Sequence, residues 1–168
     1  MILIETDRLI LRKVEEIDAA FILQLLNEPG WLEYIGDKGV RSMEDAFHYI
    51  KTGPHAMYER EGFGLFLVEW KGNQAPIGLC GLIKRDGLDD VDIGYALLAD
   101  YHNKGFAFEA AQGTLEYAKD IGLKRITAIT TKDNHSSVKL LEKLGMKPNG
   151  FVILPNDNEE LMKFSLDL

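Results

Sequence analysis

Residues 101–112, YHNKGFAFEAAQ, contain a glycine where a strand is expected to give way to a helix. The first backbone N–H groups of a helix have no partners within it, and with the helix dipole they form a site for an anion. Gly105 would let an anion approach the backbone closely, and Lys104 adds a positive charge. An ordinary strand-to-helix turn would use the same glycine for its backbone angles. The residues predicted to hold a phosphate are Asn103, Lys104, Gly105, Phe106 and Ala107.

A second polar group follows the apolar run RITAIT at residues 125–130. Asn134 lies just past this run, and Ser137 comes three residues later. The spacing is typical of a helix N-cap and first turn. It also places an amide and a hydroxyl at the carboxyl end of a strand, where open sheets bind their ligands. Both interpretations remain open on these residues alone.

The elements that must position these groups can be predicted from periodicity and turn residues. Strands are expected at 8–14, 63–70, 76–84, 91–98, 125–130, 151–154 and 161–166. Helices are expected at 17–27, 31–35, 42 to about 53, 105–121 and 136–144. The middle strands form an antiparallel meander, and the helix at 105–121 joins two parallel strands by a crossover. The sequence therefore predicts an α+β fold with a mixed sheet flanked by helices, in a single domain spanning 1–168.

The bulk composition narrows the class of protein. A net charge of −8 disfavours nucleic acid or an anionic membrane as the main partner and would favour a cationic or amine-bearing one. Charge appears already at Glu5, too early for a signal peptide, and no run of about 18 apolar residues could span a membrane, so the cytoplasm is expected. Cys80, the only cysteine, lies in an apolar run and is interpreted as a core residue rather than a nucleophile. The histidines show no metal-ligand spacing, so no metal site is expected.

Two stretches taken together carry a family resemblance. VDIGYALLADYHNKGFAFEAA at 91–111, followed by RITAITTKDNHSSVKLLEKLGMK at 125–147, resembles the GNAT acetyltransferases, in particular their ribosomal-protein N-acetyltransferase-like branch. The family loop reads Gln/Arg-x-x-Gly-x-Gly/Ala, and here Gly105 and Ala107 match while His102 departs from it. The resemblance covers nearly the whole chain. It implies a mostly antiparallel, splayed central sheet of about seven strands flanked by helices.

The resemblance also implies acetyl-CoA as the acetyl donor. Its diphosphate would lie on the N–H groups of 103–107, and its pantetheine arm would add to the open edge of the strand at 91–98. The edge residues are Ala96, Leu97 and Leu98. Asn134 would bond the cofactor arm, and Ser137 would protonate the leaving thiolate. A bulge near Leu97 would aim N–H groups at the thioester carbonyl.

An amine acceptor must also lose a proton, because alkylamines are mostly protonated at pH 7. Asp92 is the first candidate base, with an ion pair to Arg85 as its structural alternative, and Glu33 is the second. By alternation Tyr95 lies on the face opposite Asp92, although a bulge could alter that, and core packing is its structural alternative.

The segment around 31–35 is expected to line the acceptor site through Trp31, Glu33 and Tyr34, with Tyr58 completing an apolar wall. The acceptor is expected to be a small-molecule amine or a peptide N-terminus. A non-catalytic CoA or acyl-CoA sensor and a purely structural protein remain alternatives, and whether the chain forms a homodimer stays open.

Overall fold

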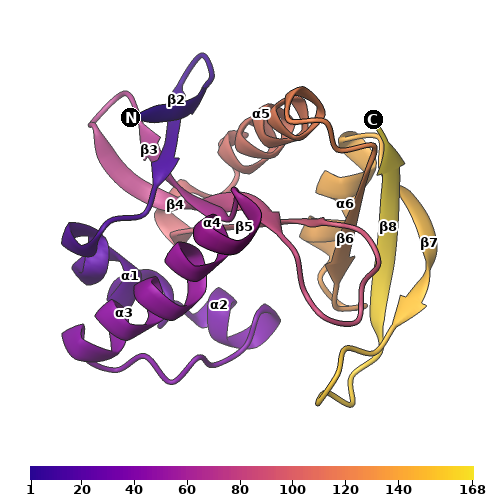
Figure 1. Cartoon of the computed structure of the whole chain (residues 1–168), viewed down its shortest axis with the longest axis horizontal. Helices are drawn as coiled ribbons and strands as arrows, with labels where there is room; N and C mark the ends of the chain where they lie inside the picture. The colour runs from indigo at the N-terminus through magenta and orange to yellow at the C-terminus, as the bar shows by residue number, and fades with distance from the viewer.

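An eight-stranded mixed sheet runs through the chain in the order β1-β2-β3-β4-β5-β6-β8-β7, and the computed structural model describes all of residues 1–168 (Figure 1). The strands are β1 Ile2–Glu5, β2 Leu9–Lys13, β3 Leu65–Trp70, β4 Ala75–Ile83, β5 Asp92–Leu97, β6 Arg125–Thr130, β7 Lys147–Val152 and β8 Leu161–Asp167. The α-helices are α1 Ala19–Leu25, α2 Pro29–Tyr34, α3 Met43–Ile50, α4 Ala56–Glu61, α5 Phe106–Asp120 and α6 His135–Lys143. Short helical segments are η1 Glu16–Asp18, η2 Lys51–His55 and η3 Ala99–Tyr101. None of the helices has both the length and the apolar character needed to cross a membrane.

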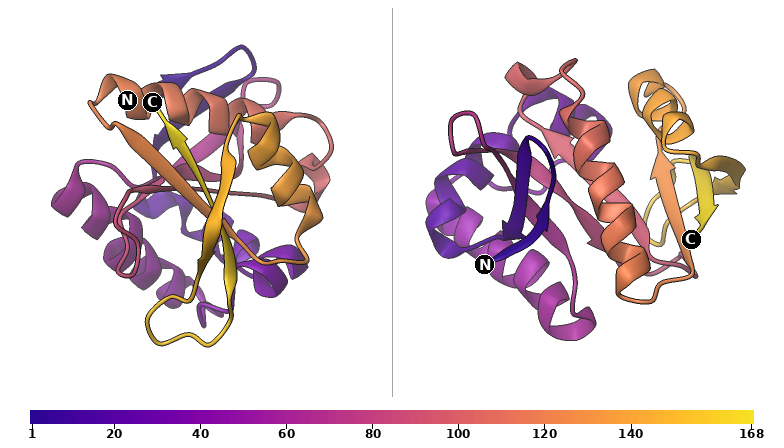
Figure 2. Two further views of the ribbon diagram at one scale, coloured as in Figure 1. Left: turned by 90° about the vertical axis from the view of Figure 1, so that its right-hand side faces the viewer. Right: turned by 90° about the horizontal axis from the view of Figure 1, so that it is seen from above.

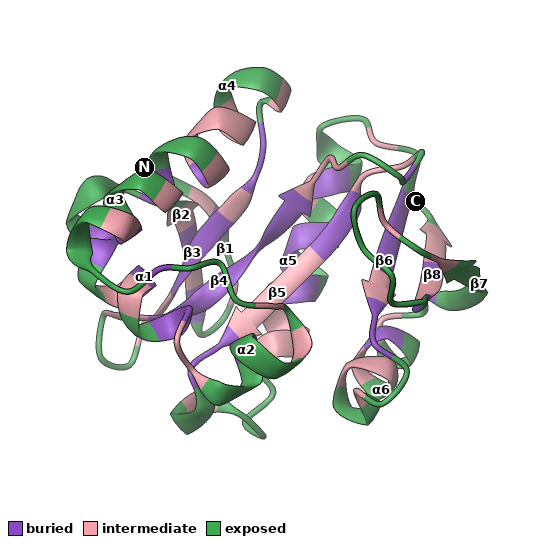
Figure 3. Ribbon diagram, turned by 90° about the horizontal axis from the view of Figure 1, so that it is seen from below, coloured by how far each residue is buried: buried purple, intermediate pink, exposed green.

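Strand pairing confirms the mostly antiparallel, splayed sheet. Every neighbouring pair is antiparallel except β5 and β6, which run parallel and pair only at Asp92 and Thr127. Beyond that point the two strands separate, and Figure 3 shows α2 and α6 lying near the ends that diverge. The carboxyl-terminal part of β5 is therefore bonded to β4 on one side and lacks a strand partner on the other.

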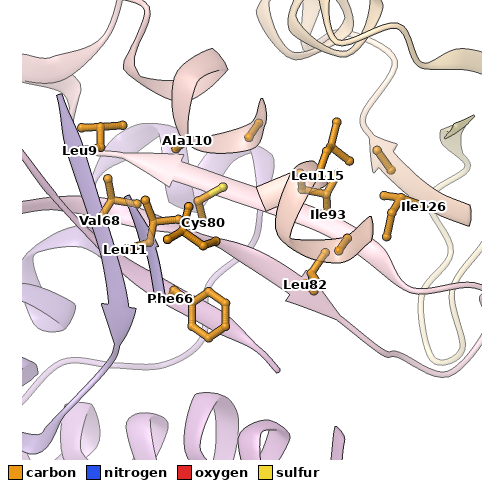
Figure 4. Packing of buried hydrophobic residues seen from close by; sticks show 14 of the residues in the cluster. Leu9, Leu11, Phe66, Val68, Cys80, Leu82, Ile93, Ala110, Leu115 and Ile126 are labelled. Carbon is orange, nitrogen blue, oxygen red and sulfur yellow. The ribbon is translucent and has the colours of Figure 1, made fainter. Parts of the chain in front are cut away.

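Apolar side chains form a core on each face of the sheet. In β3, Phe66 and Val68 join a cluster with α5 and α6, while Leu67 between them joins a cluster with α1, α2 and α3. This alternation explains why β3 reads as a continuous apolar run, since both of its faces are covered. Figure 4 shows Phe66, Val68 and Ala110 within the first cluster, and Figure 2 shows α5 lying over the sheet. The two cores fix the position of β5 between the layers.

Three element predictions needed correction. The sheet has eight strands rather than about seven, because Ile2–Glu5 pairs with β2 as β1. The helix expected to stop near Gly53-Pro54 instead passes through a π-helical turn, η2, and continues as α4. Wider π-type hydrogen bonding tolerates Pro54, which has no N–H to donate. The last hairpin begins at Lys147 rather than Phe151, because pairing with β8 starts there.

Candidate active site

The loop before α5 presents a row of free backbone donors. None of the N–H groups of residues 103–108 has a hydrogen-bond acceptor within the protein. Asn103, with φ 62°, and Gly105, with φ 81°, adopt left-handed backbone conformations, and Gly105 is the N-cap of the fifteen-residue helix α5. Unpaired amides and the positive end of the helix dipole together favour a bound anion.

The glycine in this loop faces an arginine that the sequence analysis did not single out. A Cβ on Gly105 would stand 3.3 Å from Nη2 of Arg8, and it would meet no other atom within 4 Å. Nη1 of Arg8 donates to the carbonyl of Lys104 at 3.0 Å, and the guanidinium lies 4.4 Å from the ring centroid of Phe106. The positive φ of Gly105 is therefore the firmer requirement for glycine, and an added Cβ would also make a tight contact with the end of the Arg8 side chain.

The edge of β5 offers fewer backbone groups than expected. The N–H of Leu98 donates to the carbonyl of Ile77 in β4 at 2.9 Å. Backbone groups alternate along a strand, so those of Ala96 also point to β4, while those of Tyr95 and Leu97 point toward β6. The carbonyl of Leu97 is already bonded by Nε2 of His102 at 2.9 Å, which leaves its N–H free. Of Ala96, Leu97 and Leu98, only Leu97 can offer backbone groups to a ligand at this edge.

The expected bulge in β5 is wrong. Pairing between β4 and β5 runs without a break from Ile83–Asp92 to Gly78–Leu97. The strands also lie close together here, because a Cβ at Gly78 would collide with the carbonyl of Ala96. The N–H of Leu97 lacks a strand partner because β5 separates from β6, not because of a bulge.

Two hydroxyl groups meet across the gap between β5 and α6. The phenol oxygen of Tyr95 lies 2.8 Å from Oγ of Ser137. Asn134 caps α6, and its Oδ1 accepts from the N–H of Ser137 at 3.3 Å, while its Nδ2 group has no partner in the protein. Burial raises the pKa of Tyr95 to about 12, and the hydrogen bond with Ser137 opposes that rise. Ser137 is thus held at both its backbone and its hydroxyl, with both protons present at neutral pH.

Asp92 lies at the closed end of the gap, on the face of β5 opposite Tyr95. Its carboxylate is 1% exposed and forms a two-pronged ion pair with Arg85, at 2.8 Å from Nε and 3.0 Å from Nη2. Burial raises its pKa to about 6, although Arg85 acts in the opposite direction. The alternative weighed from the sequence, an ion pair with Arg85, is present, and the shifted pKa keeps Asp92 a candidate base.

The aromatic residues expected to form an acceptor wall lie on two helices, with Trp31 and Tyr34 on α2 and Tyr58 on α4. Trp31 is only 5% exposed and packs in the cluster that contains Leu98, and its Nε1 has no hydrogen-bond partner. Tyr58 stacks on Phe66 at a centroid distance of 5.7 Å and donates to the carbonyl of Leu65, so it belongs to the core. The apolar wall with Tyr58 is wrong.

Glu33 and Tyr34 remain accessible on α2. The charge of Glu33 is the main cause that raises the pKa of Tyr34, and the charge of Asp133 on the β6–α6 loop contributes too. Tyr34 therefore lies near acidic groups from both sides of the gap. Helix α2 is tied to the end of β5 because Glu28 accepts from the N–H of Ala99 at 3.2 Å.

Cys80 is fully buried, and its Sγ lies 3.4 Å from Oγ1 of Thr114. Burial raises the pKa of this thiol to about 12. No group of three or more histidine, cysteine, aspartate or glutamate side chains is placed to hold a metal ion.

Comparison with known proteins agrees with this arrangement. Residues 8–147 match the model of the acetyltransferase (GNAT) domain. The N-acetyltransferase YnaD of Bacillus subtilis (strain 168) is 31% identical over 159 residues, covering 93% of this chain and 90% of that protein. An acetyltransferase of the GNAT family from Bacillus anthracis superposes with a TM-score of 0.81 at 28% identity, covering 99% of this chain and 98% of the other. The ribosomal L7/L12 acetyltransferase RimL, solved with coenzyme A, shares the fold with a TM-score of 0.81 at 16% identity, covering 100% and 98% of the two chains.

The class that this fold and site define is the acyltransferases that use a coenzyme A thioester. The chain belongs to the GNAT family and is an acetyl-CoA-dependent N-acetyltransferase.

Proposed function

We propose that the chain transfers the acetyl group of acetyl-CoA directly to a primary amine, on a small molecule or on a protein N-terminus. The observation that carries the proposal is the Tyr95–Ser137 hydroxyl pair, which lies where β5 and β6 diverge. The loop with free amides begins a few residues after the same strand, at the start of α5. Groups suited to a phosphate and groups suited to a leaving sulfur thus lie along one edge.

Direct transfer forms an N–C bond and breaks a C–S bond. One proton must leave the amine, and one must reach the sulfur. Ser137 is placed to deliver the second proton, and Tyr95 then replaces it through their shared hydrogen bond. Because Cys80 is buried and protonated, no thiolate of the protein is available to form an acyl-enzyme.

The remaining residues would hold the donor and activate the acceptor. The amides of 103–107 would carry the diphosphate, and the N–H of Leu97 and the free amide group of Asn134 would bond the pantetheine arm. Because Asp92 is buried, it would accept the amine proton through water. The thioester supplies the activated acetyl group when the donor is bound. With a pKa of about 6, Asp92 is mostly ionised at pH 7 and so able to accept.

The acceptor side favours a cation. Glu33 is exposed beside Tyr34, and Asp133 acts on Tyr34 from the opposite loop. The net charge of −8 adds a long-range attraction for amines. Trp31 would anchor α2 to the hydrophobic core rather than contact the acceptor.

A panel of amines tests the proposal, with release of the CoA thiol as the readout. Polyamines, amino sugars, amino acid analogues and short peptides with free N-termini are incubated with acetyl-CoA and enzyme. We expect turnover with at least one class and none with N-blocked controls. Stabilisation of the fold by CoA without turnover on any amine would favour the sensor alternative, because a bound ligand stabilises whether or not it reacts.

A further inference from the structure

We propose that Arg8 and Glu109 form a brace that sets the shape of the phosphate loop, so that both are positioning residues for the acyl donor. The inference rests on the proposed function of residues 103–107 as the phosphate site. It concerns two residues that lie 101 positions apart and that no motif in the sequence connects.

The brace is built from three hydrogen bonds to the Glu109 carboxylate and two contacts of Arg8 with the loop. Nε of Arg8 donates to Oε1 of Glu109 at 2.7 Å, and the backbone N–H of Arg8 donates to Oε2 at 2.9 Å. Thr6 adds a hydroxyl hydrogen bond to the same Oε2 at 2.5 Å. On its other side the Arg8 guanidinium donates to the carbonyl of Lys104 and covers the ring of Phe106. The strand segment before β2 is therefore fastened both to the loop and to the first turn of α5.

Without such a positioning role, a carboxylate at Glu109 would be unfavourable so close to a site for an anion. A carboxylate in the first turn of a helix interacts well with the dipole, but it would repel a phosphate bound at the same helix start. Burial alone would raise its pKa, yet hydrogen bonds from Thr6 and Arg8 outweigh burial and hold the pKa below its usual value. The carboxylate of Glu109 would repel a phosphate and yet is held ionised by Arg8. Glu109 therefore fits a residue that orders the loop rather than one that contacts the phosphate.

The loop itself shows why a brace is needed. Residues 103–108 form no backbone hydrogen bonds through their N–H groups, and two of them have positive φ. Such a segment has few internal contacts to keep its amides aligned before a ligand arrives. The carbonyl of Lys104 accepts only from Arg8, so this bond is the loop's fastening on the β2 side. Preorganised donors bind an anion without the entropic cost of ordering them.

Replacing Glu109 by glutamine separates two effects on CoA binding: the loss of the ion pair with Arg8, and the loss of a negative charge near the phosphate. Calorimetry measures the dissociation constants of CoA, 3′-dephospho-CoA and pantetheine for the wild type and for Glu109→Gln. We expect CoA and dephospho-CoA to bind about tenfold more weakly to the variant and pantetheine to bind equally. If charge alone mattered, removing a negative group would tighten CoA binding instead. Tighter or unchanged CoA binding overturns the brace.

Arg8→Lys provides the second variant, because it keeps the charge but cannot bond Glu109 and Lys104 together. It should weaken CoA binding like Glu109→Gln, and equal weakening for pantetheine would overturn the inference by showing general damage. Arg125→Gln is the matched control, since Arg125 is 42% exposed against 43% for Arg8 and also pairs with carboxylates. It should bind CoA like the wild type. Absence of CoA binding by the wild type itself would instead count against the proposed function.

Discussion

The phenol of Tyr95 on β5 and the hydroxyl of Ser137 on α6 share a hydrogen bond of 2.8 Å across the point where the sheet opens. The two residues lie 42 positions apart: Tyr95 is on β5, which pairs with β4 along its length, and Ser137 is on helix α6, which follows β6. Their contact converts a lone serine into a two-hydroxyl unit whose second member can replace the proton that the first gives up. This shared hydrogen bond predicts how substitution of either residue changes turnover.

Ser137→Ala should lower kcat by roughly 10²-fold and leave the dissociation constant of CoA nearly unchanged, because it removes a proton donor rather than a binding group. Tyr95→Phe should lower kcat less. Since the hydroxyls act as a unit, the double variant should be little worse than Ser137→Ala. Steady-state kinetics with calorimetry check this, and strictly multiplicative effects would contradict a shared role.

Gly105→Glu should abolish CoA binding, because the new side chain is negative, strains a residue at φ 81° and meets Arg8. Gly122→Glu is the matched control at the other end of α5, with φ 93° and no atom within 4 Å of its added Cβ. Both variants should lose about 1 kcal/mol of stability from backbone strain, and only the first should lose CoA. Calorimetric binding and thermal unfolding separate the two effects, and retained binding in Gly105→Glu would count against the phosphate loop.

Asp92→Asn should remove a rising limb with an apparent pKa of about 6 from the pH profile of kcat/KM. In the wild type, activity should rise as the carboxylate ionises. Rates measured between pH 5 and 8, a range around that pKa, provide the test. A limb that survives the substitution would point to Glu33 or to water as the proton acceptor.

The same residue should make stability depend on pH. Its pKa of about 6 in the folded protein lies above the ordinary value of 3.8, so the folded state binds the proton more tightly than the unfolded chain. The resulting stabilisation is complete below about pH 4 and is lost as pH rises through about 6. Denaturant unfolding should therefore show wild type losing stability relative to Asp92→Asn across this window, and parallel curves would contradict the raised pKa.

Cys80 should not react with thiol reagents in the folded protein, because its side chain is fully buried and its pKa is raised to about 12. Cys80→Ala should keep kcat within about twofold and lose about 1–2 kcal/mol of stability from the lost packing. Thiol titration before and after denaturation checks the first part. Loss of turnover without loss of fold would reopen an acyl-enzyme route.

Local patterns carried much of the prediction. Alternation and turn residues located most of the strands, and the crossover helix was placed to within a residue of α5. A helix cap was one of the two interpretations of Asn134 and Ser137, and the hydrogen bond of that cap is present. The edge strand Ile2–Glu5 and the continuation of the helix through Pro54 were missed. An edge strand and a π-helical turn both depend on what packs against them.

The sequence by itself determined the features that depend on near neighbours: the glycine turn opening α5, the Asn134 cap and the core position of Cys80. Only the tertiary structure decided which distant groups meet. Tyr95 reaches Ser137 and Arg8 reaches Glu109, because sheet order and helix packing bring together residues that no helical or strand period relates. Likewise the single Asp92–Thr127 pairing, and not any one residue type, leaves the edge of β5 open.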